Sequence, residues 1–385
     1  MTKLNTFQLS RQADEIGPTK KINGFDGVRG IAAISVVLTH LGFWEFLKNQ
    51  NKLARKLEPL FNGTMGVQAF FILSGFLITL LLAREIQETN TISIKKFMVR
   101  RSLRILPLYV LFCLLATILT LHFENVASWS SLYYAYFYVY NFVPIKDYFP
   151  LLGHTWSLAV EEHFYIIWPA IFSLMFMRRK NILTVGLIVF ISLSIFIHFV
   201  LMDHGLGDTY FIARWSFTAG YSIALGCLAA LLMQGKSTAD FCVEILRHRL
   251  AGPLGILLYV NSLYLSSGSW FIQNIVSGYI RSIAILIFIM WIYCNQRSSI
   301  VACLESRPLK YIGTISYGIY MWQGFLLGTG PARLRDQYWP PSPYIGLAIL
   351  VVVAPLSYHY FETAFLKLKR NYASSPTRSI ALLNK

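Results

Sequence analysis

Three ionisable residues lie in one apolar stretch near the start of the chain, NGFDGVRGIAAISVVLTHLGF. Arg29 and His40 are eleven positions apart, which at about 100° per residue is about 20° past three full helical turns. They therefore share one helical face, about 16 Å apart along the axis, and Asp26 can neutralise Arg29 from three positions earlier. Histidine titrates near neutral pH and is a natural general base. We expect this face to line a polar passage; the alternative is an arginine that snorkels to the interface and a histidine that caps the outer end.

A second polar group begins the stretch HTWSLAVEEHFYIIWPAIF, where Glu161 and Glu162 stand beside His163. Two carboxylates at the edge of an apolar stretch are costly in hydrocarbon and indicate function, although they could also decorate the membrane interface. Neighbouring residues on a helix point about 100° apart, so we expect one carboxylate to face the interior and the other the interface. A carboxylate such as Glu161 could orient and stabilise the imidazolium of His40.

Arginines are concentrated in the segment KKFMVRRSLRILPLY, at Arg100, Arg101 and Arg104. Their planar guanidinium groups suit the phosphates of a soluble cofactor, or they simply mark the cytoplasmic side of a membrane protein.

Earlier in the chain, Ser74 and Gly75 interrupt the apolar run GVQAFFILSGFLITLLL. This pair forms either a notch for helix packing or a place where a ligand approaches the backbone.

The elements that hold these residues are expected to be membrane helices. The 385 residues are 55% hydrophobic and only 14% charged, with a mean hydropathy of +0.52, whereas soluble domains carry about 25% charged residues. The net charge of +16 is then assigned to cytoplasmic loops and not to a nucleic-acid partner. The five cysteines have no zinc-like spacing, so we expect neither a metal site nor a disulfide framework.

Ten stretches are long and apolar enough to cross the membrane, which predicts an all-α polytopic bundle of about ten transmembrane helices. Of the 34 Lys and Arg residues, 24 fall on one side and seven on the other, which predicts that both termini are cytoplasmic. We expect cytoplasmic tails over 1–21 and 366–385 around a membrane domain over 22–365. The Tyr-rich run WSSLYYAYFYVYNF is expected to form a helix in the outer interface. The expected spans are 24–44, 64–84, 103–122, 158–177, 182–201, 211–233, 250–266, 274–294, 311–330 and 343–363.

The order of the motifs resembles that of the membrane acyltransferase 3 family, integral-membrane O-acyltransferases that modify bacterial surface sugars and similar acceptors. The resemblance covers about residues 22–365. The chain departs from the family pattern at His163, where Gln is usual, at Gln323, where many members have His, and at Ala364, where Pro is common. The motifs are FDGVRG followed by the Arg-x10-His spacing, FFILSGFL at 70–77, RRSLRILPLY at 100–109, WSLAVEEHFY at 156–165 and ISYGIYMW at 315–322.

The resemblance implies that an acyl-CoA donor, with acetyl-CoA the first expectation, enters from the cytoplasm and acylates a hydroxyl of a cell-surface polysaccharide or lipid-linked glycan. It implies that His40 is catalytic, that Arg29 orients the donor or the developing charge, and that Glu161 is the motif glutamate. It implies a multi-pass protein of the bacterial inner membrane, and we do not expect the extracytoplasmic hydrolase-like domain that some members carry. The residues expected to bind acyl-CoA are Arg100, Arg101, Arg104 and Ser74, and those expected to support the site are Asp26, Trp156, Ser157, Glu162, Tyr317 and Glu362.

Other readings fit the same residues. A transporter or flippase for a glycan or small anion would also use buried Arg, His and Glu, and a sensor or scaffold would need none of their chemistry. Within the enzyme class, a succinyl or longer acyl group, a small glycoside such as a macrolide as acceptor, and a covalent acyl-histidine intermediate stay open. The oligomeric state is also open.

Overall fold

The computed structural model describes residues 22–43, 62–122, 128–204, 209–248, 250–265, 272, 276–327 and 342–372. Within these ranges the secondary structure is helical and contains no β-strand, which confirms the all-α prediction. The main helices are α2 (Phe25–His40), α5 (Gly63–Thr89), α6 (Ile94–His122), α7 (Trp129–Tyr136), α8 (Thr155–Asp203), α9 (Thr209–Ile212), α10 (Ser216–Ala219), α11 (Tyr221–Leu232), α12 (Lys236–Arg247), α13 (Ala251–Leu265), α14 (Ser277–Cys294), α15 (Ser299–Leu304), α16 (Arg307–Thr314), α17 (Ser316–Leu326), α18 (Pro343–Leu356) and α19 (Thr363–Leu368). Shorter turns are η2 (Tyr140–Phe142), η3 (Ile145–Asp147), η4 (Pro150–Leu152), the π-helical η6 (Ser357–Glu362) and η7 (Lys369–Tyr372).

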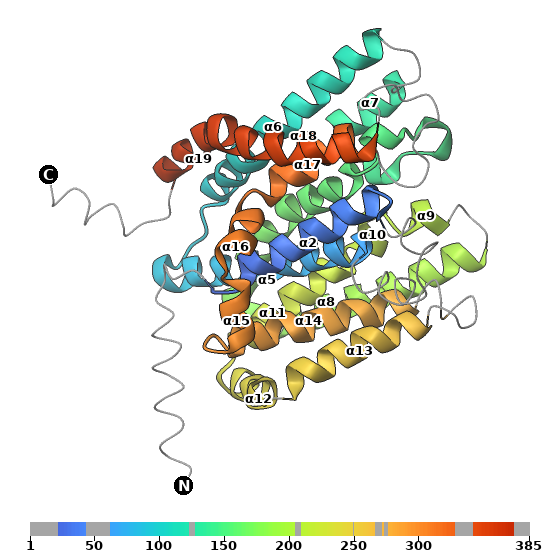
Figure 1. Ribbon diagram of the computed structural model, residues 1–385. Coiled ribbons are helices and arrows are strands. Elements are labelled where there is room, and N and C mark those ends of the chain that lie inside the picture. The colour runs from blue at the N-terminus through green and yellow to red at the C-terminus, as the bar shows by residue number, and fades with distance from the viewer. Residues whose placement is uncertain are drawn as a thin grey trace, which may run out of the picture.

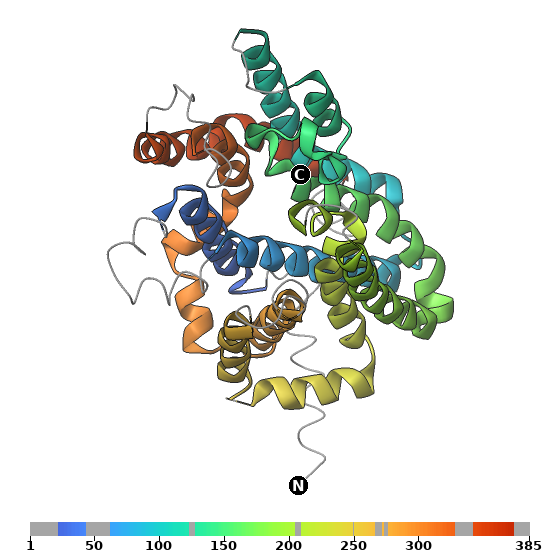
Figure 2. The same cartoon turned by 90° about the vertical axis from the view of Figure 1, so that its right-hand side faces the viewer.

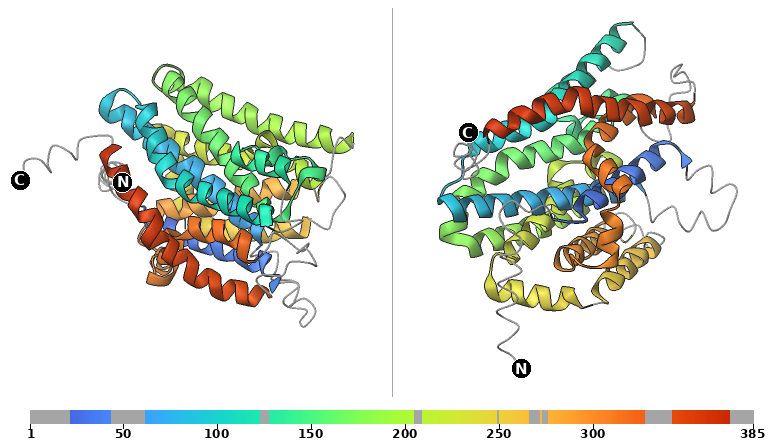
Figure 3. Two further views of the ribbon diagram at one scale, coloured as in Figure 1. Left: turned by 90° about the horizontal axis from the view of Figure 1, so that it is seen from above. Right: turned by 60° about the vertical axis from the view of Figure 1, so that its left-hand side comes forward.

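The long helices form one bundle in which most axes run in a similar direction (Figures 1 and 3). Helix α5 runs through the middle of the bundle, in contact with α2 on one side and α11 on another (Figure 2). Helices α13 and α14 pack together at one edge, and α18 and α19 lie along the opposite edge, beside α17 and α6 (Figure 1). Helix α17, near the end of the chain, thus packs against α2 and α6, while α5 contacts α2 and α8.

Six helical stretches of the described residues are long and apolar enough to cross a membrane: Gly63–Thr89, Ile94–His122, Thr155–Phe176, Arg179–Asp203, Ser277–Cys294 and Tyr344–Leu368. They coincide with six of the ten expected spans. Helix α8 contains two of them because the backbone is non-helical at Arg179 (φ −143°, ψ 44°). The multi-pass character of the chain is therefore supported.

The other four expected spans contain shorter helices: α2 has 16 residues, α11 has 12, α13 has 15 and α17 has 11. Helix α17 is short because the chain breaks at Ile315, where the Ser316 hydroxyl donates to the Gly313 carbonyl. Such side-chain bonds compete with the helical ladder. The count of ten spans and the cytoplasmic position of both termini therefore remain predictions.

Close backbone packing joins α5 to α11. A methyl group at Gly75 would collide with the Ile223 carbonyl, and one at Gly226 would collide with the Ile72 carbonyl. Small residues of this kind let membrane helices approach closely where apolar burial supplies little driving force. The packing-notch explanation thus holds for Gly75, and it fixes how α5 is rotated about its axis.

Replacing Gly75 with alanine should destabilise the bundle, because the new methyl group meets rigid backbone and not a movable side chain. Overpacking of this kind typically costs about 1–3 kcal/mol. Thermal unfolding of the purified protein, followed by size-exclusion chromatography, measures the effect. The matched control is Gly186→Ala in α8, where no atom lies within 4 Å of the new methyl group. Equal melting temperatures for the two variants would contradict the notch.

Two expected features lie outside the described residues, namely the tail over 1–21 and the end of the tail over 373–385. Within the Tyr-rich run the structure has helix α7, and its Trp129 and Tyr133 side chains are exposed. Exposed aromatic rings suit a membrane interface. The position of α7 relative to the bilayer remains a prediction.

Candidate functional site

A small cavity of about 70 Å³ lies among α2, α5, α6, α8 and α17. The side chains around it come from five helices that are far apart in the sequence, so the fold and not a local motif builds the site. Seven residues singled out from the sequence line it: Arg29, Ser74, Arg101, Arg104, Ser157, Glu161 and Tyr317. The cavity therefore brings together residues from all of the acyltransferase-like motifs.

Close contact between α2 and α16 holds Arg29 in the cavity wall. The Leu309 carbonyl lies against Gly30, and the Asp26 carbonyl lies against Gly313, so no side chain fits at either glycine. On the same helix, Asp26 interacts electrostatically with Arg29, as the spacing of three residues predicts. Asp26 does not itself line the cavity. Its position supports a role in holding the arginine.

A hydrogen-bonded group connects α5 with α8 inside the cavity. The Ser74 hydroxyl donates to Oε1 of Glu161 at 2.7 Å, and the Tyr165 hydroxyl donates to Oγ of Ser74 at 3.4 Å. Glu161 also interacts electrostatically with Arg29 and Arg101. Ser74 thus faces the cavity while its neighbour Gly75 packs on α11. Glu162 does not line the cavity, as expected for one of two adjacent carboxylates.

The three arginines of α6 have different surroundings. The Arg101 guanidinium lies over the rings of Tyr165 and Phe97, with Cζ 5.2 and 5.8 Å from the ring centroids. Arg104 lines the cavity and interacts electrostatically with Arg29. Arg100 does not line it.

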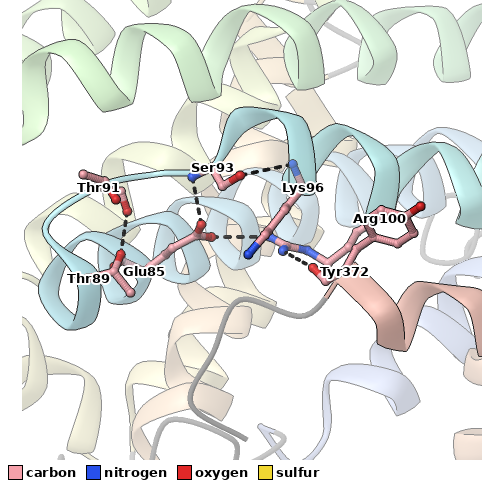
Figure 4. Close-up of polar contacts among 7 residues, drawn as sticks. All are labelled: Glu85, Thr89, Thr91, Ser93, Lys96, Arg100 and Tyr372. Carbon is pink, nitrogen blue, oxygen red and sulfur yellow. Dashed lines mark hydrogen bonds and ion pairs between the residues drawn. The ribbon is translucent and has the colours of Figure 1, made fainter. Parts of the chain in front are cut away.

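The side chain of Arg100 is held by two contacts that lie outside the cavity lining. Its Nη2 lies 3.3 Å from Oε2 of Glu85, and its Nη1 donates to the Tyr372 carbonyl at 2.9 Å (Figure 4). Two of the three predicted donor-binding arginines therefore reach the cavity, while the third ties α6 to α5 and to η7.

His40 is the last residue of α2 and contacts a different partner from the one expected. Its Nδ1 lies 2.9 Å from Oε1 of Gln323, a fully buried residue of α17. With Oε1 of Gln323 as the acceptor, Nδ1 donates and Nε2 keeps the lone pair that a general base needs. We expected Glu161 beside His40; the structure places Glu161 on Ser74, and Gln323 on His40. His40 is also not among the residues that line the cavity.

His154 lies near His40, in a fully enclosed position. It is 3% exposed, and the Leu151 backbone lies within hydrogen-bonding reach of its ring. Its imidazole interacts electrostatically with His40. Its ring also lies against the backbone of Gly324, where it leaves no room for a side chain. A buried imidazole next to the predicted base is an addition to the candidate site that the motifs did not include.

Tyr320 lines the cavity and also contacts His154. Its ring lines the cavity, and its hydroxyl donates to the His154 carbonyl at 2.9 Å and lies 2.6 Å from the Ser157 hydroxyl. Ser157 lines the cavity as well. Tyr320 and Ser157 thus connect the lining of the cavity with the backbone of His154.

The remaining predicted support residues pack around these groups. The Arg214 guanidinium lies 5.5 Å from the Trp156 ring, and Arg214 interacts electrostatically with His40. In η6, buried Glu362 accepts from the Ser357 hydroxyl at 3.3 Å and interacts electrostatically with Arg104. Tyr317 donates to the Ile105 carbonyl at 2.7 Å.

The sequence interpretation missed the neighbours of His40, which are Gln323, His154 and Arg214. Each is a polar residue in an apolar stretch, and such residues are costly unless they serve a purpose. Gln323 entered that interpretation only as a departure from a family pattern. The signal was therefore present, but the partners lie far apart in the chain.

Comparison with known proteins gives an independent result. Residues 22–360 match the family described as an acyltransferase domain. A Staphylococcus aureus (strain COL) protein provisionally named an O-acetyltransferase is 29% identical over 370 residues, which cover 90% of this chain and 57% of that protein. Peptidoglycan O-acetyltransferase OatA of Listeria monocytogenes is 26% identical over 366 residues (90% and 56%), and O-acetyltransferase OatA of S. aureus (strain NCTC 8325) is 27% identical over 379 residues (93% and 59%). The chain thus spans a little over half the length of these relatives. No solved structure matches it significantly.

Proposed function

Because this chain belongs to the membrane acyltransferase 3 family, we propose that it is an integral-membrane O-acetyltransferase that transfers an acetyl group from acetyl-CoA to a hydroxyl of a cell-surface glycan. The observation that carries the proposal is the joint presence of a cationic cavity and an imidazole held in the tautomer of a base. The cavity contains Arg29, Arg101 and Arg104, and the imidazole is that of His40.

The cavity supports a phosphate-bearing donor. Guanidinium groups pair with phosphate oxygens through planar, charge-assisted hydrogen bonds. Arg29, Arg101 and Arg104 provide three such groups in its lining. Acetyl-CoA carries such phosphates, and the acetyl group is proposed from the names of the O-acetyltransferase relatives.

The proposed chemistry assigns the proton transfers to His40. Nε2 accepts the proton of the acceptor hydroxyl as its oxygen attacks the thioester carbonyl carbon. The new C–O bond forms, the C–S bond breaks, and the CoA thiolate leaves with the proton that His40 returns. Gln323 keeps the Nδ1 proton in place throughout, in the way that the third member of a catalytic triad orients its histidine.

The donor must extend from the arginines to His40. Arg29 and His40 lie at opposite ends of α2, and the pantetheine arm of CoA is long enough to reach between them. His40 does not line the cavity, and Tyr320 both lines it and bonds the His154 backbone, so we propose that the Tyr320 side chain moves to let the acetyl group reach His40. The movement of the Tyr320 side chain is part of the proposed mechanism.

We propose a sugar hydroxyl of peptidoglycan as the first acceptor to test. The support is the name of the Listeria relative, which is 26% identical over 90% of this chain. Lipid-linked glycans, other surface polysaccharides and small glycosides are the alternatives within the same reaction class. His154, which interacts electrostatically with His40, is the residue that we propose contacts the acceptor beside the base.

The function is tested with purified protein in lipid nanodiscs, radiolabelled acetyl-CoA and peptidoglycan fragments. The enzyme should release one free CoA for each acetyl ester formed, and mass spectrometry of the fragments should show the mass of the added acetyl group. A transporter would leave the thioester intact. Release of CoA without any acetylated fragment would reject peptidoglycan and redirect the search to other glycans.

Replacing Gln323 with alanine should lower kcat about tenfold with little change in KM for acetyl-CoA, because residues that orient a reacting histidine contribute about 10–100-fold. The Gln323→Glu variant keeps an acceptor oxygen and should retain more activity than the alanine variant. Steady-state kinetics at fixed folded protein concentration measure both. A KM effect as large as the kcat effect, or no rescue by Gln323→Glu, would indicate a structural role only.

A further inference from the structure

The segment after the last apolar helix packs back onto the arginine-bearing helix. Helix α19 and η7 both contact α6 (Figure 1). The Tyr372 carbonyl in η7 accepts a hydrogen bond from Arg100, which fixes the end of this segment on α6 (Figure 4). Residues far from the arginine motif in sequence therefore lie beside it.

Lys369 begins η7 and is half-buried in this contact. Its electrostatic neighbours are Arg104, Arg101, Arg100 and Arg29, which are all positively charged. No ion pair of Lys369 is present among the described residues. The geometric link is the packing of η7 on α6, where the Tyr372 carbonyl three residues after Lys369 accepts from Arg100.

The arginines differ from Lys369 in having acidic neighbours. Arg100 pairs with Glu85, and both Arg29 and Arg101 interact with Glu161. Arg104 interacts with Glu362. Each of the four arginines thus has a carboxylate near it that offsets its charge. Lys369 adds one further positive charge.

Burial, and then the four neighbouring arginines, lower the pKa of Lys369 to about 8. Both effects disfavour the charged ammonium group in the absence of an anion. A bound phosphate would reverse them, because an opposite charge favours the protonated form. The electrostatics therefore fit a site that is complete only when an anion is bound.

We propose that Lys369 binds a phosphate group of the acyl-CoA donor, beside Arg101 and Arg104. The inference rests on the proposed function and extends it, since it adds a residue from outside the motifs of the arginine helix. Lys369 acts as a compact point charge with three donors, which complements the planar guanidinium groups. The same phosphate chemistry is available from an anionic lipid headgroup, and the experiment separates the two sources.

The test measures CoA binding by isothermal titration calorimetry to the full-length protein in nanodiscs of zwitterionic lipid. The Lys369→Met variant should bind CoA about tenfold more weakly, the loss expected for one hydrogen bond to a charged group. Lys369→Arg should recover most of the affinity. The matched control is Lys367→Met, which removes an exposed lysine from the same segment and should leave CoA binding unchanged. Melting temperatures without ligand check that the variants are folded.

Equal CoA affinities for the Lys369→Met and Lys367→Met proteins would overturn the inference. If Lys369→Met instead abolishes only the stabilisation by anionic lipid, the lysine binds a lipid headgroup and the inference also fails. These outcomes leave the proposed function intact, because the wild type still binds CoA. A wild-type protein that binds no CoA would reject the acyl-CoA donor itself.

Comparing CoA with dephospho-CoA then shows whether the 3′-phosphate or the pyrophosphate contacts Lys369. A loss of affinity in the Lys369→Met variant for either ligand supports the inference.

Discussion

Replacing His40 with alanine should lower acetyl transfer about 1,000-fold while the amount of folded protein stays normal. The expected size follows from the loss of a general base, which contributes about 100- to 10,000-fold. The imidazole is placed for this role because Gln323 accepts from Nδ1 and leaves Nε2 available. Release of CoA from labelled acetyl-CoA, with the glycan acceptor present, measures the rate.

The control for this variant is His122→Ala, which removes an exposed histidine at the end of α6. It should retain full activity. Near-normal transfer by the His40→Ala protein would remove His40 from the mechanism.

The same variant also tests for a covalent intermediate. A stable labelled protein that forms with acetyl-CoA alone, and disappears in the His40→Ala variant, would favour the acyl-histidine route over direct transfer.

Replacing Glu161 with glutamine should lower kcat/KM about 100-fold. Glu161 is the carboxylate that interacts with Arg29 and Arg101 in the cavity wall, and it accepts from Ser74. Glutamine keeps the size and a hydrogen-bond acceptor but removes the charge, so the arginines lose the group that positions them. Misplacement of binding groups by about 1 Å is enough for a 100-fold loss. Transfer assays over a range of acetyl-CoA concentrations measure the change.

The neighbouring residue supplies the matched control. Glu162 also interacts with Arg101, but it does not line the cavity. The Glu162→Gln protein should stay within a few-fold of the wild type. If both variants lose the same activity, the carboxylates act on overall stability, and the specific role of Glu161 is wrong.

The sequence predicts the helical class and most of the cavity because both depend on local patterns. Apolar stretches long enough to cross a bilayer give the six confirmed helices. The cost of charge in hydrocarbon singles out Arg29, Arg101, Arg104 and Glu161, and all four line one cavity. Of the two adjacent carboxylates, only Glu161 lines the cavity, and whether Glu162 reaches the membrane interface stays a prediction.

The partners within the site are not predictable from local patterns. Gln323 contacts His40 across 283 positions of sequence, and the choice between Gln323 and Glu161 depends on how α2, α8 and α17 are rotated. The rotation of α5 is set by glycine contacts with α11, which put Ser74 and not Gly75 into the cavity. Backbone breaks such as the one at Ile315 also depend on a side-chain bond that hydropathy does not register.

The position of Tyr320 has a consequence for the permeability of the membrane. It lines the arginine-lined cavity, and its hydroxyl donates to the His154 carbonyl. An enzyme that handles a donor on one face of a bilayer and an acceptor on the other needs a seal between them. A single aromatic side chain in this position would let an acetyl group through during turnover while protons and ions stay on their own side.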